Sequence, residues 1–125
     1  MRIQSNPLFI GFPETYSGTA IHAKPMSEYV VRNPVLILPD GSVDYYETVV
    51  FALRRNKRLC VIMERGGQNC HLLVSAREKT GLSLFHLPHA LELVPDGSEI
   101  TVSQGGAVDI VESVPVFSRI TLPAP

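Results

Sequence analysis

The same turn signal occurs twice in this chain, each time beside apolar runs. Pro39-Asp40-Gly41-Ser42 follows the apolar residues 35–38, and Pro95-Asp96-Gly97-Ser98 lies between 91–94 and 100–102. Proline presets the φ angle of the first turn position, aspartate hydrogen-bonds to the turn backbone, and glycine adopts positive φ without steric cost. Such a turn between apolar runs predicts a β-hairpin. The expected building unit is therefore strand–turn–strand, which indicates a mainly β protein.

Other short apolar runs, separated by turn residues, extend this pattern along the chain. Gly66-Gly67 predicts a hairpin that joins 59–64 to 69–75. Many short strands with frequent turns are typical of a small antiparallel β-sandwich or a partly open barrel. We expect strands over 35–38, 59–64, 69–75, 82–86, 90–94, 98–102, 107–112 and 116–122.

The segment 43–53 fits two structures. A helical stripe runs through it, formed by Tyr45, Tyr46, Val49, Val50 and Leu53. The same segment is rich in tyrosine, valine and other strand-forming residues, and a predicted hairpin turn precedes it. We expect a strand here; the alternative is an α+β fold with one helix near 44–55.

Length and composition indicate one domain over residues 1–125. The chain is 45% hydrophobic and 18% charged, which is typical of a globular protein with a buried core. Prolines and glycine interrupt residues 1–34, so we expect a loosely structured N-terminal segment with short strands at about 8–10, 19–23 and 29–31. No apolar run has the length of a membrane span or a signal peptide core. We therefore expect a cytoplasmic protein that makes no membrane contact, with two free cysteines.

Charge is unevenly distributed although the net charge is only −1. Residues 1–53 carry three basic and five acidic groups, 54–79 carry seven basic and two acidic, and 80–125 carry one basic and five acidic. A basic middle between two acidic parts suits docking to a charged partner or self-association.

The basic cluster after residue 53 is the best candidate for a partner-binding site, and it consists of Arg54, Arg55, Lys57 and Arg58. Four cations within five residues can bind phosphates or an acidic protein surface, and the alternative is a merely solvated turn. The rest of the chain is acidic and few aromatic residues lie near the cluster for base stacking. The sequence therefore favours an acidic protein partner over nucleic acid.

Cysteine and histidine provide a second set of candidates, made up of Cys70, His71, His86 and His89, with Tyr45 or Tyr46 beside them. In the predicted hairpin, neither plausible register brings Cys60 and Cys70 to disulfide distance. Adjacent strand residues point apart, which argues against a Cys70–His71 thiolate pair, and His86 and His89 would lie on opposite faces. We expect no metal, no cofactor and no catalytic residues.

The last third of the chain resembles one known family. Residues 81–85 (Gly-Leu-Ser-Leu-Phe) and 93–102, with Asp96-Gly97 followed by Ile100, are similar to the C-terminal half of forkhead-associated (FHA) domains. The resemblance implies a β-sandwich recognition module. The Gly-Arg pair of the phosphothreonine-binding members is absent, so phosphopeptide binding does not carry over.

Taken as a sequence, the chain predicts a non-enzymatic interaction or adaptor module that docks a charged partner through a basic loop. One alternative is a small enzyme or a metal- or ligand-binding barrel that uses Cys70, His71, His86 and His89. A second alternative is a structural assembly subunit that forms a homo-oligomer.

Overall fold

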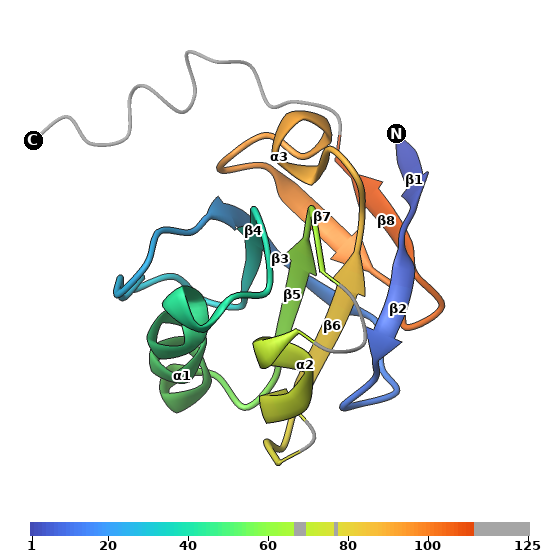
Figure 1. Cartoon of the computed structure of the whole chain (residues 1–125). Coiled ribbons are helices and arrows are strands. Elements are labelled where there is room, and N and C mark those ends of the chain that lie inside the picture. Colours follow the sequence, from blue (N-terminus) through green and yellow to red (C-terminus); the bar gives the residue numbers. More distant parts are fainter. Residues whose placement is uncertain (67–69, 77, 112–125) are drawn as a thin grey trace, which may run out of the picture.

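The computed structural model describes residues 1–66, 70–76 and 78–111, and it contains one mixed eight-stranded sheet. The strand order is β1-β8-β7-β3-β4-β5-β6-β2 (Figure 1). The strands are β1 (Arg2–Gln4), β2 (Asn6–Phe9), β3 (Tyr16–His22), β4 (Pro34–Leu38), β5 (Leu59–Met63), β6 (Leu82–His86), β7 (Glu99–Val102) and β8 (Ala107–Ile110). The helices are the 3-10 helix η1 (Val43–Tyr45), α1 (Tyr46–Arg55), α2 (His71–Ala76) and α3 (Ala90–Leu93).

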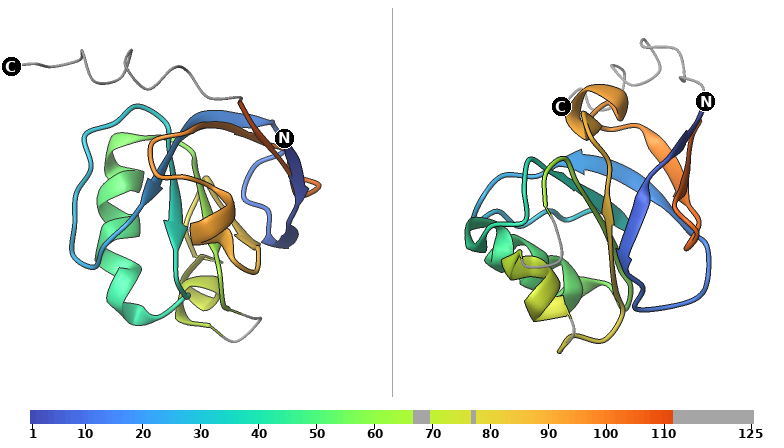
Figure 2. Two further views of the ribbon diagram at one scale, coloured as in Figure 1. Left: turned by 90° about the horizontal axis from the view of Figure 1, so that it is seen from above. Right: turned by 45° about the vertical axis from the view of Figure 1, so that its right-hand side comes forward.

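The prediction of a mainly β protein is confirmed, but the strands are not all antiparallel. β3, β4, β5 and β6 run parallel to one another, and the remaining pairs are antiparallel. Parallel neighbours need a long crossover between them. α1 is the crossover from β4 to β5, and α2 is the crossover from β5 to β6. The two helices lie on the same side of the sheet (Figures 1 and 2).

The N-terminal stretch that contains β1 and β2 closes the sheet into a barrel-like shape. β1 and β2 are the two ends of the strand order, yet only Ser5 separates them in sequence. This continuous stretch pairs with β8 through its first half and with β6 through its second half (Figure 1). At the bend, the Ser5 amide and hydroxyl both donate to the Gly106 carbonyl oxygen, at 2.8 and 2.7 Å.

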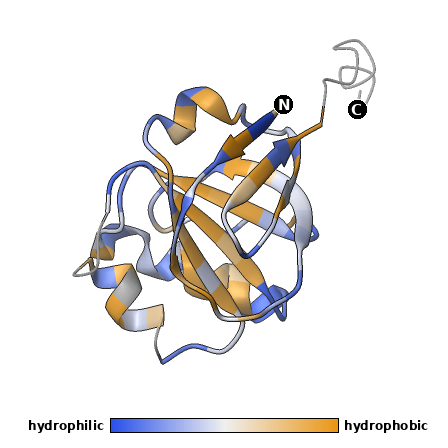
Figure 3. Cartoon of the chain, turned by 90° about the vertical axis from the view of Figure 1, so that its right-hand side faces the viewer, coloured by the Kyte–Doolittle hydropathy of each residue, from blue (hydrophilic) through white to orange (hydrophobic). Residues whose placement is uncertain are grey.

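Successive side chains along each strand point to opposite faces of the sheet, so the strands contribute to two hydrophobic cores. One core lies inside the curled sheet and the other lies between the sheet and the helices. On β4, Val35 and Ile37 join the interior core, whereas Leu36 and Leu38 face the helices. α1 and α2 cover the second core, and the strands are hydrophobic along most of their length (Figure 3). The sequence therefore shows near-continuous apolar runs in the central strands, as parallel strands covered on both faces require.

The strand expected over 43–53 is wrong, because the segment forms η1 and α1. Thr48, Val49 and Ala52 are buried on one helix face, which packs against the sheet. Burial of this stripe outweighs the strand preference of the valines and tyrosines. The turn at Pro39-Asp40-Gly41 accordingly leads from β4 into a crossover helix and does not form a hairpin.

Two further predicted strands are helices. Within the segment expected as a strand over 69–75, residues 71–75 belong to α2, whose Leu72 and Ala76, four residues apart, are buried. Within the segment 90–94, residues 90–93 form α3, which buries Ala90. The second Pro-Asp-Gly turn joins α3 to β7, with Gly97 at φ 87°. The strand predicted over 116–122 lies outside the described residues.

The remaining strands fall close to their predicted positions, and the N-terminal segment is more regular than expected. Residues 1–34 contain β1, β2 and β3, followed by an irregular loop over 23–33 where a strand at 29–31 was expected. These strands are regular because their backbones pair with β6, β7 and β8 from the far end of the chain, which local sequence signals do not report.

Candidate functional site

A cavity of about 540 Å³ opens at the amino ends of β3, β4 and β5. It lies between three connections: the loop before β3, the end of the 23–33 loop, and the link from α1 to β5. Polar and basic side chains dominate its walls. The lining residues are Phe12, Thr15, Tyr16, Ser17, Arg32, Asn33, Arg55, Asn56, Lys57 and Arg58.

Asn56 fixes the relative position of two of these connections. It is the C-cap of α1, and its Nδ2 donates to the Ala52 carbonyl oxygen at 3.0 Å. Its Oδ1 accepts a hydrogen bond from the backbone N–H of Asn33 at 3.2 Å. The basic residues after α1 are thereby held next to Arg32.

Two of the cations in the cavity are paired with carboxylates on neighbouring loops. Arg55 Nε lies 2.7 Å from Glu28 Oε2, and Arg58 Nη1 lies 2.9 Å from Glu14 Oε1. The Arg58 guanidinium also stands over the Phe12 ring, 5.5 Å from its centroid. The two ion pairs are solvent-exposed, so each contributes under about 1 kcal/mol to stability.

The other two cations, Arg32 and Lys57, are exposed. Neither makes a side-chain hydrogen bond or ion pair within the part of the chain that the structure describes. With Arg55 and Arg58 neutralised by their partners, the cavity keeps an excess of two positive charges. Such a cleft attracts anionic groups.

The structure brings together three of the four residues predicted as a basic cluster. Arg55, Lys57 and Arg58 line the cavity, whereas Arg54 points elsewhere, with its guanidinium 6.0 Å from the centroid of the Phe51 ring. Sequence reasoning missed Arg32, which lies just before β4. The role of the cluster in partner binding stays a prediction.

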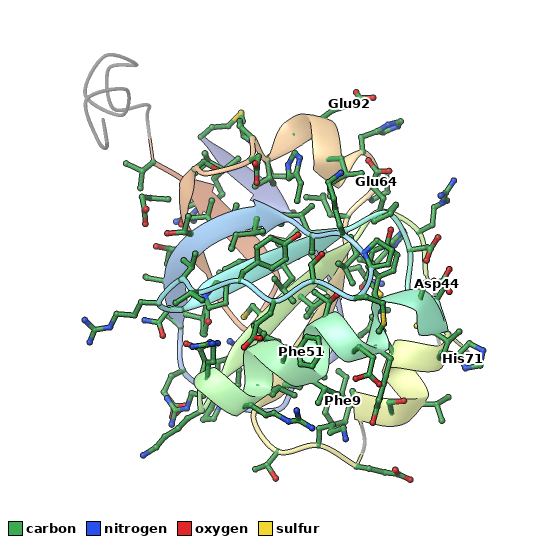
Figure 4. All side chains as sticks on the ribbon, turned by 90° about the vertical axis from the view of Figure 1, so that its left-hand side faces the viewer. Phe9, Asp44, Phe51, Glu64, His71 and Glu92 are labelled. Atoms are coloured by element: carbon green, nitrogen blue, oxygen red, sulfur yellow. The ribbon has the colours of Figure 1, made fainter. Side chains whose placement is uncertain are left out.

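The second set of candidates lies at the other end of the parallel strands. Cys70 packs beside Gly41 and Met63, and the ring Nε2 of His86 donates to the Glu64 carbonyl oxygen at 3.1 Å. His71 begins α2 and His89 precedes α3, and both are exposed. In Figure 4, Glu64, Asp44 and His71 lie away from the end of the molecule where α1 terminates.

The cysteine and histidine candidates do not come together in one site. Within residues 1–66, 70–76 and 78–111, no three histidine, cysteine or acidic side chains are arranged to hold a metal ion. Tyr45 and Tyr46 do not line the cavity; Tyr46 instead packs under Lys79, whose Nζ lies 5.3 Å from the ring centroid.

Two ionisable side chains occupy the barrel interior. Burial raises the pKa of the Cys60 thiol to about 12, and burial also raises the pKa of the Tyr16 phenol. The Tyr16 hydroxyl donates to the Pro34 carbonyl oxygen at 2.9 Å. Both groups are therefore neutral at physiological pH, and they belong to the scaffold beneath the cleft.

Comparisons with known proteins show the fold. No family model matches the chain, and no curated protein matches it. The solution NMR structure of a UPF0107 protein is similar, with a TM-score of 0.56 at 14% sequence identity, covering 90% of this chain and 100% of the other. Identity this low establishes a shared fold alone. No helix in the described residues is both long and apolar enough to cross a membrane.

Proposed function

We propose that this chain is a non-enzymatic docking module that binds an acidic protein partner in the basic cleft at the amino ends of β3, β4 and β5. The observation that carries the proposal is the pair of exposed cations, Arg32 and Lys57, that have no side-chain partner in the described structure. An acidic partner would supply the carboxylates that these two side chains lack.

The cleft suits a protein better than a nucleic acid. Phe12 and Tyr16 are its aromatic residues, and each is only 6% exposed. Single-stranded nucleic acids are bound by aromatic faces on which bases stack, and these two rings offer no such face. The exposed groups are cations, hydroxyls and amides, which match carboxylates and peptide groups.

The test compares two charge reversals that differ by three residues in sequence. Lys57→Glu changes a cation in the cleft, and Arg54→Glu makes the same charge change outside it. Tagged wild-type and variant proteins are used to capture partners from the native host at low and high salt. We expect wild type and Arg54→Glu to retain an acidic partner at low salt, and Lys57→Glu to lose roughly tenfold in affinity for it.

Binding by Lys57→Glu equal to that of wild type would overturn the proposal, as would an equal loss for Arg54→Glu. Circular dichroism of both variants checks that they are folded. Sedimentation of the isolated wild-type chain then distinguishes a separate partner from a second copy of this chain.

A further inference from the structure

A second cavity, of about 360 Å³, adjoins the basic cleft and has a different chemistry. The two cavities share Ser17, Arg32 and Asn33, so together they form one continuous groove. The second cavity lies over β3 and β7. Its lining is completed by Gly18, Thr19, Glu99, Ile100, Thr101 and Val111.

Hydroxyl groups and a carboxylate characterise the second cavity. The Ser17 and Thr101 hydroxyls are hydrogen-bonded to each other at 3.0 Å. The Thr19 hydroxyl donates to Oε1 of Glu99, also at 3.0 Å. Glu99 is exposed, and no cation pairs with it within the described ranges of the chain. One end of the groove is therefore basic and the other end is acidic.

The length of the groove can be estimated from the number of strands that it crosses. It runs across β7, β3, β4 and β5, which are consecutive neighbours in the sheet. Three interstrand spacings amount to roughly 14 Å, and an extended chain rises by about 3.3 Å per residue. About four residues of extended polypeptide are enough to reach from Lys57 to Glu99.

We infer that the groove binds an extended segment of the partner that is acidic at its Lys57 end and carries a basic residue at its Glu99 end. The inference rests on the proposed function and adds the charge order of the bound segment. A uniformly acidic segment would place a carboxylate beside Glu99, and like charges at that position are unfavourable. Arg32, at the junction of the two cavities, is positioned to bind the central part of the segment.

The test uses two labelled hexapeptides that differ at one end. Both contain three glutamates followed by glycine and serine; one ends in lysine amide and the other in glutamate amide. Fluorescence anisotropy at low salt measures their affinity for the full chain. We expect wild type to bind the lysine peptide roughly three- to fivefold more tightly, in the range of an exposed ion pair.

Glu99→Gln and Glu92→Gln form a matched pair of variants. Both replace an exposed carboxylate, but Glu92 lies on α3 and lines neither cavity. We expect Glu99→Gln to abolish the preference between the peptides and Glu92→Gln to keep it. Equal affinity of wild type for the two peptides, or a preference that survives in Glu99→Gln, would overturn the inference while leaving the proposed function intact. Failure of both peptides to bind would count against the proposed function itself.

Discussion

At the scale of single residues, Gly18 allows β3 to lie close to the backbone of Asn33. A Cβ atom at this position would collide with the Asn33 carbonyl oxygen, which also accepts a hydrogen bond from the Thr19 amide at 3.2 Å. Gly18→Ala should therefore push β3 away from the 33–34 connection. We expect a loss of about 1–3 kcal/mol in the free energy of unfolding, measured by urea denaturation.

Gly105→Ala is the matched control for this change. A Cβ atom at Gly105 would approach only the Ser103 hydroxyl oxygen, at 4.0 Å, so we expect a change within about 0.5 kcal/mol. Equal stability of the Gly18→Ala variant and wild type would show that the close approach of the two backbones is dispensable.

In the proposed docking, Glu14 and Glu28 would compete with the acidic partner for the cleft. They hold Arg58 and Arg55 in ion pairs, which a partner carboxylate has to displace. We expect Glu14→Gln and Glu28→Gln to bind the lysine-ended hexapeptide roughly two- to fivefold more tightly than wild type in the anisotropy assay. Asp44→Asn, on η1 and outside the cleft, should leave the affinity unchanged; a decrease in affinity for Glu14→Gln would contradict the competition.

Cys60 gives stability a defined dependence on pH. Its pKa is raised from 9.0 to about 12 by burial, so the folded state keeps a proton that the unfolded state loses above pH 9. This contribution is complete below pH 9 and is lost as the pH rises towards 12, at up to about 1.4 kcal/mol per pH unit. We expect Cys60→Ala to show a shallower alkaline loss of unfolding free energy than wild type, and parallel curves would contradict this assignment.

At the scale of elements, Thr48 couples α1 to the loop that carries Arg32. Its buried hydroxyl donates to the Lys24 carbonyl oxygen at 2.8 Å and accepts from the Ser27 amide at 3.1 Å. Thr48→Val keeps the shape but leaves both backbone groups without this partner, at a cost of about 1–3 kcal/mol in unfolding free energy. We also expect weaker hexapeptide binding, because the 23–33 loop loses its attachment to the helix.

Thr48→Ser retains the hydroxyl and removes only the methyl group. It therefore separates the contribution of the two hydrogen bonds to stability from the contribution of methyl packing. We expect it to bind the hexapeptide as wild type does and to remain closer to wild type in unfolding free energy. If Thr48→Val also binds like wild type, the 23–33 loop is positioned without this contact.

The elements also explain what the sequence could predict. The apolar runs that became β4, β5 and β6 were recognisable because strands buried on both faces are nearly continuous in hydrophobicity. The stripe through Val49 fitted a helix as well as a strand, and only the parallel pairing of β4 with β5, which needs a crossover, decides between them. Short α2 and α3 carry too few residues for a periodic signal.

Of the candidate site, only the residues that are close together in sequence could be predicted. Arg55, the last residue of α1, and Lys57 and Arg58 just after it were visible as part of a basic cluster. Arg32 and Glu99 join the groove only through the parallel β3–β4 and antiparallel β3–β7 pairings, which bring together segments far apart in sequence. Without the strand order, no local pattern links them.

At the scale of the whole molecule, closure of the sheet and the basic cleft are separate features. Closure depends on β1 and its pairing with β8, where Ile3 lies opposite Val108 and packs against the interior core. The cleft lies at the amino ends of β3, β4 and β5, in the middle of the strand order. We therefore expect β1 to separate from β8 without disturbing the basic cleft.

Ile3→Ala tests this separation. Loss of part of a half-buried side chain should cost about 1–2 kcal/mol, mainly by favouring local opening of β1 from β8. We expect faster hydrogen exchange at the β8 amides of Val108 and Ile110, unchanged slow exchange at Leu36 and Ile37 of β4, and wild-type affinity for the lysine-ended hexapeptide. Arg2→Ala, which removes only an exposed ion pair with Asp109, should leave exchange in both strands unaltered. Equal acceleration in β8 and β4 would mean that the sheet opens as one unit, and the cleft would then depend on the N-terminal strand that closes the barrel.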